Sequence, residues 1–147
     1  MIFRIRHGTK EDAAAIARLA TELGYPAPLD AMTTRVKAIS ASGSDLLLVA
    51  VGPANEPVAW LQAHAAQILE SGVRVEIVGL IVSTEARRSG LGRSLVDEAE
   101  RWARNIQAKT LVARSDIKRT ESHAFYPALG FTLAKTQHVY RKTLECA

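Results

Sequence analysis

One segment limits the fold more than any other: a long apolar strand leads into a glycine-rich turn, and an amphipathic helix follows at once. Residues 73–82 begin with alternating side chains and end in the nearly continuous apolar run 79–82, which is typical of a strand in the middle of a sheet. Gly79 within this run indicates a β-bulge. The helix carries an apolar stripe at helical spacing, formed by Leu91, Leu95, Ala99, Trp102 and Ile106. These features require a central sheet with a helix packed against it.

Further strands and helices are predicted on both sides of that segment. Apolar runs predict strands at residues 2–6, 46–51, 58–69 and 110–114, and a closing hairpin from 131–133 and 138–142. Helical spacing of apolar residues predicts helices after Thr9, near Asp30 and over 119–129. The mixture indicates an α+β fold with a sheet between helices. A length of 147 residues fits one domain, residues 1–147.

Composition and cysteine content place the chain in a cellular compartment. Cys146 is the one cysteine in the sequence, so no disulfide forms within a chain and a reducing environment is expected. The N-terminus lacks the apolar run of a signal peptide. No stretch reaches the roughly 20 apolar residues that a membrane span needs. We therefore expect a cytoplasmic protein with no membrane partner.

The charge is mildly basic, with 19 Lys and Arg against 15 Asp and Glu. The densest basic run, residues 87–93, is built around glycines rather than aromatic residues. A nucleic-acid-binding domain more often carries a long basic stripe with interleaved aromatic side chains. The run at 87–93 suits a compact polyanion such as a pyrophosphate, so we expect no nucleic-acid partner.

The glycine-rich turn is suited to phosphate binding. Gly90 and Gly92 stand at the start of the long helix, where the first N–H groups have no partner inside the helix and attract an anion. Two well-known phosphate loops do not fit. A P-loop would need glycine at Arg87 and lysine at Arg93, and a dinucleotide-binding loop would need glycine at Leu95. A third pattern, [Q/R]xxGx[G/A], is matched in full by Arg87, Gly90 and Gly92.

This third pattern resembles the pyrophosphate loop of the GNAT superfamily of acyl-CoA N-acyltransferases. A second segment of the same superfamily type lies at 123–131, where a tyrosine, Tyr126, is followed by a short spacer and Gly-Phe. The resemblance covers almost the whole chain. It implies a mixed, largely antiparallel central sheet flanked by helices on both faces. It also implies transfer of an acetyl group from acetyl-CoA to a primary amine of a small molecule or peptide, by direct attack in a ternary complex.

The resemblance implies a set of cofactor contacts. Backbone groups of Ile81 and Val82 would hold the pantetheine arm. The pyrophosphate would be bound through Arg87, Arg88, Ser89, Gly90, Leu91, Gly92, Arg93 and the Ser94 hydroxyl. Arg119 stands where the superfamily often has an asparagine that helps to hold the pantetheine arm, so Arg119 would instead contact a CoA phosphate.

Two side chains are candidates for the chemistry. Tyr126 matches the tyrosine that lies near the cofactor sulfur in the superfamily, and it would protonate the leaving thiolate. Glu76 interrupts the apolar strand that leads to the loop, and it would act as general base through water. Pairing of Glu76 with Arg74 or another cation is an equally good interpretation, and His64 on the preceding strand is a second candidate for the base. Residues with metal-ligand spacing are absent from the sequence, so no metal is expected.

Two other function classes remain open on the sequence alone. A non-catalytic acyl-CoA sensor would keep the loop and use Glu76 and Tyr126 only for packing. A nucleic-acid-binding domain would bind in a salt-dependent way and ignore CoA. No motif identifies the acceptor amine. The exposed-looking strands and the closing hairpin are compatible with a homodimer.

Overall fold

The structure, a computed structural model, describes residues 2–115 and 119–145. Cys146 lies outside the described residues. The chain divides into two compact units, residues 1–114 and 115–147, and the single-domain interpretation stays a prediction. None of the described helices combines the length and apolar character that a membrane crossing requires.

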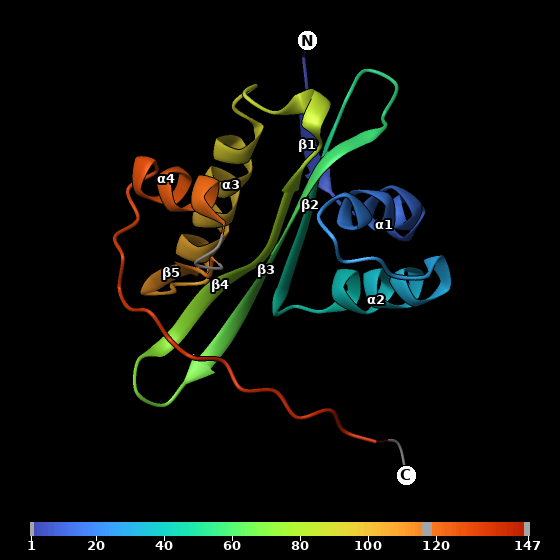
Figure 1. The fold of residues 1–147 in the computed structure, drawn as a ribbon. Coiled ribbons are helices and arrows are strands. Elements are labelled where there is room, and N and C mark those ends of the chain that lie inside the picture. The colour runs from blue at the N-terminus through green and yellow to red at the C-terminus, as the bar shows by residue number, and fades with distance from the viewer. Residues whose placement is uncertain (1, 116–118, 146–147) are drawn as a thin grey trace. The chain divides into compact units, whose positions relative to one another are not determined.

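The first unit contains a five-stranded sheet in which the strands follow one another in sequence order, β1-β2-β3-β4-β5 (Figure 1). Its elements are β1 (Arg4–His7), the short 3-10 helix η1 (Lys10–Asp12), α1 (Ala13–Glu22), α2 (Leu29–Ala41), β2 (Asp45–Val51), β3 (Pro57–Ile68), β4 (Gly72–Val82), the short 3-10 helix η2 (Thr84–Ala86), α3 (Leu91–Asn105) and β5 (Thr110–Ala113). The pairings from β1 to β4 are antiparallel, and β5 pairs with β4 in parallel. The predicted mixed, largely antiparallel sheet is confirmed.

Helices cover both faces of this sheet, as predicted: α1 and α2 lie on one face and α3 on the other (Figure 1). Because side chains alternate between faces along a strand, Leu47, Val49 and Val51 of β2 point to the same side. They form a buried cluster with Ile16 of α1 and Val36 of α2. That side is called the α1/α2 face below. On α3, Leu91, Leu95 and Ala99 of the predicted stripe are buried, together with Val96 and Ala103. Trp102 and Ile106, the other two residues of the stripe, are only partly buried.

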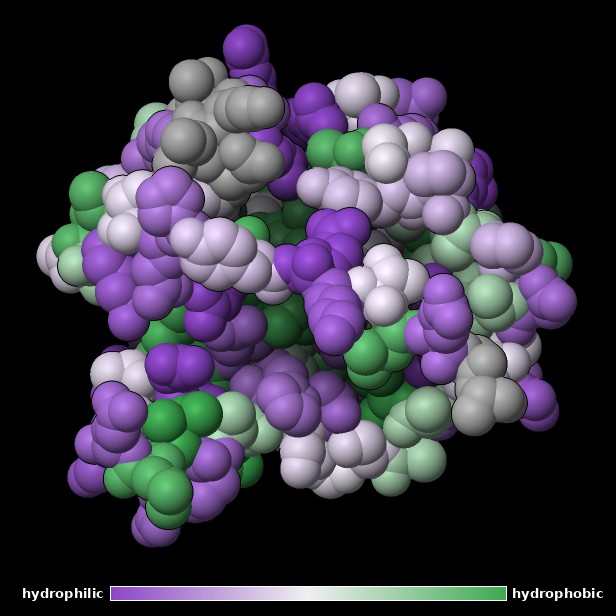
Figure 2. Space-filling view, turned by 60° about the horizontal axis from the view of Figure 1, so that its bottom comes forward, coloured by the Kyte–Doolittle hydropathy of each residue, from purple (hydrophilic) through white to green (hydrophobic). Residues whose placement is uncertain are grey.

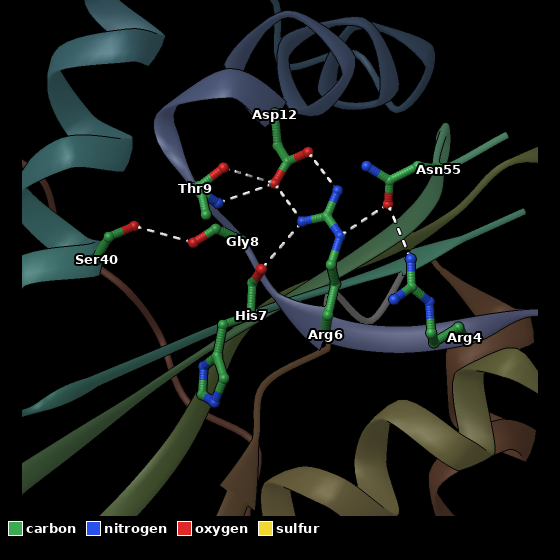
Figure 3. Close-up of polar contacts among 8 residues, drawn as sticks. All are labelled: Arg4, Arg6, His7, Gly8, Thr9, Asp12, Ser40 and Asn55. Atoms are coloured by element: carbon green, nitrogen blue, oxygen red, sulfur yellow. Dashed lines mark hydrogen bonds and ion pairs between the residues drawn. The ribbon is translucent and has the colours of Figure 1, made fainter.

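A polar cluster ties β1 to the beginning of the first helical segment (Figure 3). Arg6 donates to both carboxylate oxygens of Asp12, at 2.8 and 2.9 Å. The Thr9 amide donates to the same carboxylate at 2.8 Å, as expected where a helix starts after Thr9. Asn55, in the turn between β2 and β3, accepts hydrogen bonds from Arg4 and Arg6. The cluster therefore fixes the angle at which the chain leaves the sheet.

The predicted bulge in β4 is present and coincides with a change in pairing. Gln62 of β3 lies opposite Gly79, but the next residue of β3 lies opposite Ile77, so Val78 is the extra residue. The register between β4 and β5 also ends at Ile77. Among the described strands, β4 is thus paired on one side only from Val78 to Val82. Gly79 is needed there, since a Cβ on it would lie 2.6 Å from the Trp60 ring.

The second unit contains one helix, α4 (Thr120–Ala128), among its described residues. Gly130 ends this segment in the left-handed conformation, with φ of 93°. The Phe131 amide donates to the Tyr126 carbonyl at 3.1 Å. The hairpin predicted from 131–133 and 138–142 is wrong, because residues 131–145 form no strand. Alternating side chains mark a surface that suits a strand, but a strand also needs a partner for its backbone groups.

Hydrophobic areas are interrupted by hydrophilic side chains over the face viewed in Figure 2. Several large apolar side chains are nevertheless strongly exposed in the described part of the second unit, namely Leu133, Val139, Tyr140 and Leu144. Scattered exposed apolar residues are normal on a protein surface, but this density over a short extended segment is unusual.

Candidate active site

The glycine-rich loop joins η2 to α3 and has the backbone geometry expected of an anion cradle. Gly90 caps α3 in the left-handed conformation, with φ of 83°. A Cβ added to Gly90 would meet nothing within 4 Å, so the glycine faces open space rather than packed protein. Arg88 also has a positive φ of 63°. Left-handed residues in a turn can direct successive N–H groups toward one anion, so the two in this loop suit such a role.

The N–H groups of this loop divide into those already used and those still available. The Ser94 amide donates to the Gly90 carbonyl at 3.0 Å, so Ser94 offers only its exposed hydroxyl. The Ser89 hydroxyl donates to the Ala86 carbonyl and holds the loop in shape. The Leu91 side chain is buried in the core, which leaves its amide for a ligand. The first amides of α3, from Leu91 to Arg93, are those that have no partner inside a helix.

The pantetheine candidates lie on the part of β4 beyond the bulge. The Ile81 side chain is buried against Leu19 and Ala20 of α1, so only its backbone is available. The Val82 carbonyl accepts a hydrogen bond from Arg87 Nε at 3.2 Å. An extended ligand pairing with this edge would find the same kind of backbone groups that a sixth strand would find.

Tyr126 lies in α4 with its ring half-buried between two phenylalanines. The ring centres of Phe125 and Phe131 are 5.0 and 5.4 Å from that of Tyr126, and both contacts are edge-on. Burial raises the pKa of the Tyr126 phenol above its usual value near 10, while the positive charge of Arg119 opposes the shift. The phenol therefore keeps its proton at neutral pH, as a proton donor must.

Glu76 is not isolated on its strand. Arg114, just after β5, donates from Nε to Glu76 Oε1 at 2.9 Å. The interpretation that Glu76 pairs with a cation is therefore confirmed. The cation is Arg114 and not Arg74. Such a partner fixes the carboxylate in one orientation and does not by itself exclude a role as base, because a carboxylate can accept several hydrogen bonds.

A neighbouring polar pair escaped the sequence predictions. His64 Nδ1 lies 3.0 Å from Asp45 Oδ1. Asp45 is opposite His64, and His64 is opposite Glu76, so these side chains form a row across three adjacent strands. The signal was present in the sequence: counting back along the two strands from the turn at 52–57 brings Asp45 opposite His64. A strand predicted to start at residue 46 left Asp45 in the loop.

The predicted site residues therefore fall in two groups. Glu76, Ile81, Val82 and the loop from Arg87 to Ser94 belong to the first unit and lie along one strand and the turn after it. Tyr126 and Arg119 belong to the second unit. Within the described residues, no three side chains of His, Cys, Asp or Glu gather as a metal-binding group.

Comparison with known proteins identifies the family. Residues 13–131 match the model of the acetyltransferase (GNAT) family. An aminoglycoside N(6')-acetyltransferase type 1 from Stenotrophomonas maltophilia is 26% identical over 96% of this chain and 94% of its own length. AAC(6')-Iy, solved with a bisubstrate analogue made from CoA and acetylneamine, has 20% identity and a TM-score of 0.86 over 98% of this chain and all of its own.

A third relative has the same fold under a different name. A transcriptional regulator from Bacillus halodurans C-125 superposes with a TM-score of 0.87, at 24% identity, over 96% of this chain and all of its own. At such identities, likeness of structure establishes the fold and not the activity. The family match carries the activity, because it spans most of the chain and includes both the loop and the Tyr126 segment. The chain belongs to the GNAT acetyltransferase family and is an acyl-CoA-dependent N-acetyltransferase with acetyl-CoA as co-substrate.

Proposed function

We propose that the chain acetylates a primary amino group of an aminoglycoside, and that acetyl-CoA and the amine meet at the edge of β4 beyond Ile77. The observation that carries this proposal is the end of β5 pairing at Ile77. Beyond Ile77 the edge of β4 that faces away from β3 has no partner among the described strands. This edge begins next to Glu76 and leads to the Arg87–Ser94 loop. The S. maltophilia relative is an aminoglycoside acetyltransferase, and this chain is similar to nearly its whole length. That similarity supports an aminoglycoside as the acceptor.

The loop would bind the cofactor from one end. The pyrophosphate would accept hydrogen bonds from the first amides of α3 and from the Ser94 hydroxyl, and Arg88 and Arg93 would add positive charge. The arm would then run along the backbone of Val82 and Ile81. Arg87 would release the Val82 carbonyl as the arm binds, and its guanidinium would turn to the phosphates. Arg119 would contact a CoA phosphate.

The chemistry would proceed by direct attack. The acceptor arrives as an ammonium ion, because alkylamines have a pKa of about 10, and it must lose a proton before its nitrogen can attack the thioester carbonyl. Glu76 would take that proton through a water molecule. When the C–S bond breaks, the Tyr126 phenol would give its proton to the CoA sulfur, and a backbone N–H near Val82 would stabilise the oxyanion.

An amine panel tests the acceptor class. Aminoglycosides with a free 6'-amino group, linear polyamines and short peptides are compared at equal concentration by release of free CoA thiol. We expect the highest kcat/KM with an aminoglycoside. Preference for a peptide or polyamine would reject the acceptor and keep the enzyme class. Cleavage of acetyl-CoA with no amine preference would reject the proposal as a whole.

Tyr126→Phe tests the proton donor. We expect kcat to fall about 100-fold, a typical contribution of general acid catalysis, with an unchanged acetyl-CoA Kd. Tyr140→Phe is the matched control, because Tyr140 lies in the same unit with its side chain exposed. Equal rates in the two variants would remove Tyr126 from the mechanism.

Two wider expectations belong to the same proposal. A homodimer would cover the exposed Leu133, Val139 and Leu144, and sedimentation equilibrium would detect it as a doubled mass. A cytoplasmic location, without nucleic-acid or membrane partners, would place the enzyme where acetyl-CoA is made. Fractionation of cells expressing the tagged chain tests that location.

A further inference from the structure

Three ionisable side chains form a row across the α1/α2 face of the sheet. Asp45, His64 and Glu76 are directly opposite one another on β2, β3 and β4, and directly opposite residues share a face. Asp45 also alternates with Leu47 along β2, and Leu47 packs in the cluster with α1 and α2. The row therefore lies on the α1/α2 face.

This row stands immediately before the part of β4 that would meet the substrates. His64 is two residues from Gln62, where the bulge begins, and Glu76 precedes Ile77, where pairing with β5 ends. The middle residue of the row is the most exposed. The side chain of His64 is 47% exposed, whereas those of Asp45 and Glu76 are 14% and 21% exposed. His64 is thus the member of the row with the best access to water.

We propose that His64, held in place by Asp45, receives the proton that the acceptor ammonium gives to Glu76 and passes it to solvent. This inference rests on the proposed function, because it needs Glu76 as the first proton acceptor. His64 is a positioning and relay residue here, since it acts on the substrate only through Glu76. Asp45 orients the imidazole through its contact with Nδ1.

The proton balance of the relay is simple. One N–H bond of the ammonium breaks, and the proton reaches the Glu76 carboxylate through water. It then moves to Nε2 of His64, because Nδ1 is already committed to Asp45 at 3.0 Å and that contact selects the tautomer with a proton on Nδ1. The imidazolium loses the Nε2 proton to bulk water, and the row returns to its starting state with no other reactant consumed.

The surrounding charges suit a group that is charged only briefly. Asp45 contacts His64 from β2 at 3.0 Å and favours the imidazolium. Glu76 lies opposite His64 on β4, and its carboxylate is held by Arg114 from the β5 side. Arg74, opposite Ala66, and Arg114, bonded to Glu76, oppose it. The ring therefore has groups of both signs around it, as suits a residue that carries its charge only while the proton passes.

The test uses acceptor amines of graded basicity with His64→Gln and Asp45→Asn. A strongly basic acceptor must be deprotonated, whereas a weakly basic one such as hydroxylamine is already neutral at pH 7. We expect kcat/KM to fall about 100-fold for the basic acceptor, the lower end of the usual contribution of general acid–base catalysis, and less than about 3-fold for the weakly basic one. The acid limb of the pH–rate profile should move in both variants.

His7→Gln is the matched control, because His7 is a strand histidine of the same sheet outside the row. His64→Ala supplies a second readout: added imidazole should restore part of the rate with the basic acceptor. An equal loss with both acceptors, or no rescue by imidazole, would overturn the relay and leave a structural role. Failure of the proposed function would appear instead in the wild-type amine panel, before any variant is made.

Discussion

The arginines of the first unit occupy two very different surroundings. Arg6 donates to both oxygens of Asp12, to the His7 carbonyl and to Asn55, all between 2.8 and 3.0 Å. Arg87 has one weak hydrogen bond, to Val82 at 3.2 Å, and the Arg88 and Arg93 side chains make no hydrogen bond or ion pair within the described residues. A guanidinium with four of its five N–H donors in use, as in Arg6, stabilises the fold, whereas one with most donors spare is available to a ligand.

The two regions also differ in whether the chain supplies the anion that their donors bind. Asp12 is 5% exposed and is an anion supplied by the chain itself. The loop at 87–94 also offers several donors, but its own sequence contains no Asp or Glu. Each region can therefore be disrupted in a way that leaves the other intact, which makes the division between folding and binding testable.

The largest effect is expected at the loop. Gly90→Glu places a side chain and a negative charge where the pyrophosphate would bind, so we expect acetyl-CoA Kd to rise on the order of 1,000-fold, about 4 kcal/mol. Isothermal titration calorimetry with CoA measures this directly. Gly72→Glu is the control, because Gly72 has a similar φ of 79° and also faces open space. Similar CoA affinity in the two folded variants would rule the loop out as the binding site.

A smaller effect, on stability rather than binding, is expected from the Arg6 cluster. Asp12→Ala leaves Arg6 without its carboxylate, and we expect the free energy of unfolding to fall by about 3 kcal/mol. Urea denaturation measures the loss, and CoA affinity of the folded variant should not change. A weakened CoA affinity would mean that the cluster and the loop are coupled.

The stability difference between wild type and Asp12→Ala should also depend on pH. Burial of Asp12 opposes its ionisation, but hydrogen bonds from Arg6 and the Thr9 amide outweigh burial and lower the pKa of Asp12. A lowered folded-state pKa contributes stability above the unfolded-state value of about 3.9, and that contribution is lost as the pH falls through the folded-state value. The stability gap between wild type and Asp12→Ala should therefore be full at pH 6 and shrink below about pH 4.

The smallest effect is expected for Arg87→Ala. Its guanidinium must leave the Val82 carbonyl before it can reach a phosphate, so part of its binding energy is spent on that exchange. We expect CoA affinity to fall about 5-fold, with a shallower dependence on salt because one charge is lost. The melting temperature should stay within about 1 °C, since the side chain is exposed. A loss close to that of Gly90→Glu would show that the arginine, and not the loop backbone, dominates binding.

Local signals in the sequence were enough for most of the fold. Gly79 predicted the bulge and Gly90 predicted the turn before α3, because a close approach to Trp60 at one position and a positive φ at the other leave a mark on residue choice. Contacts between distant segments were harder. The cation beside Glu76 proved to be Arg114, 38 residues away, and Asp45 was missed by a one-residue error in a strand boundary. The final hairpin failed because alternation at 138–142 carries no information about a partner strand.

The bulge at Val78 has a consequence for handling the protein. Past that point β4 offers a row of backbone donors and acceptors with a strand on one side only, among the strands described, and such edges promote aggregation. A cofactor that lies along the edge would protect it as a neighbouring strand does. Yield and shelf life would then follow the CoA content of the preparation, so CoA belongs in the purification buffer as well as in the assay.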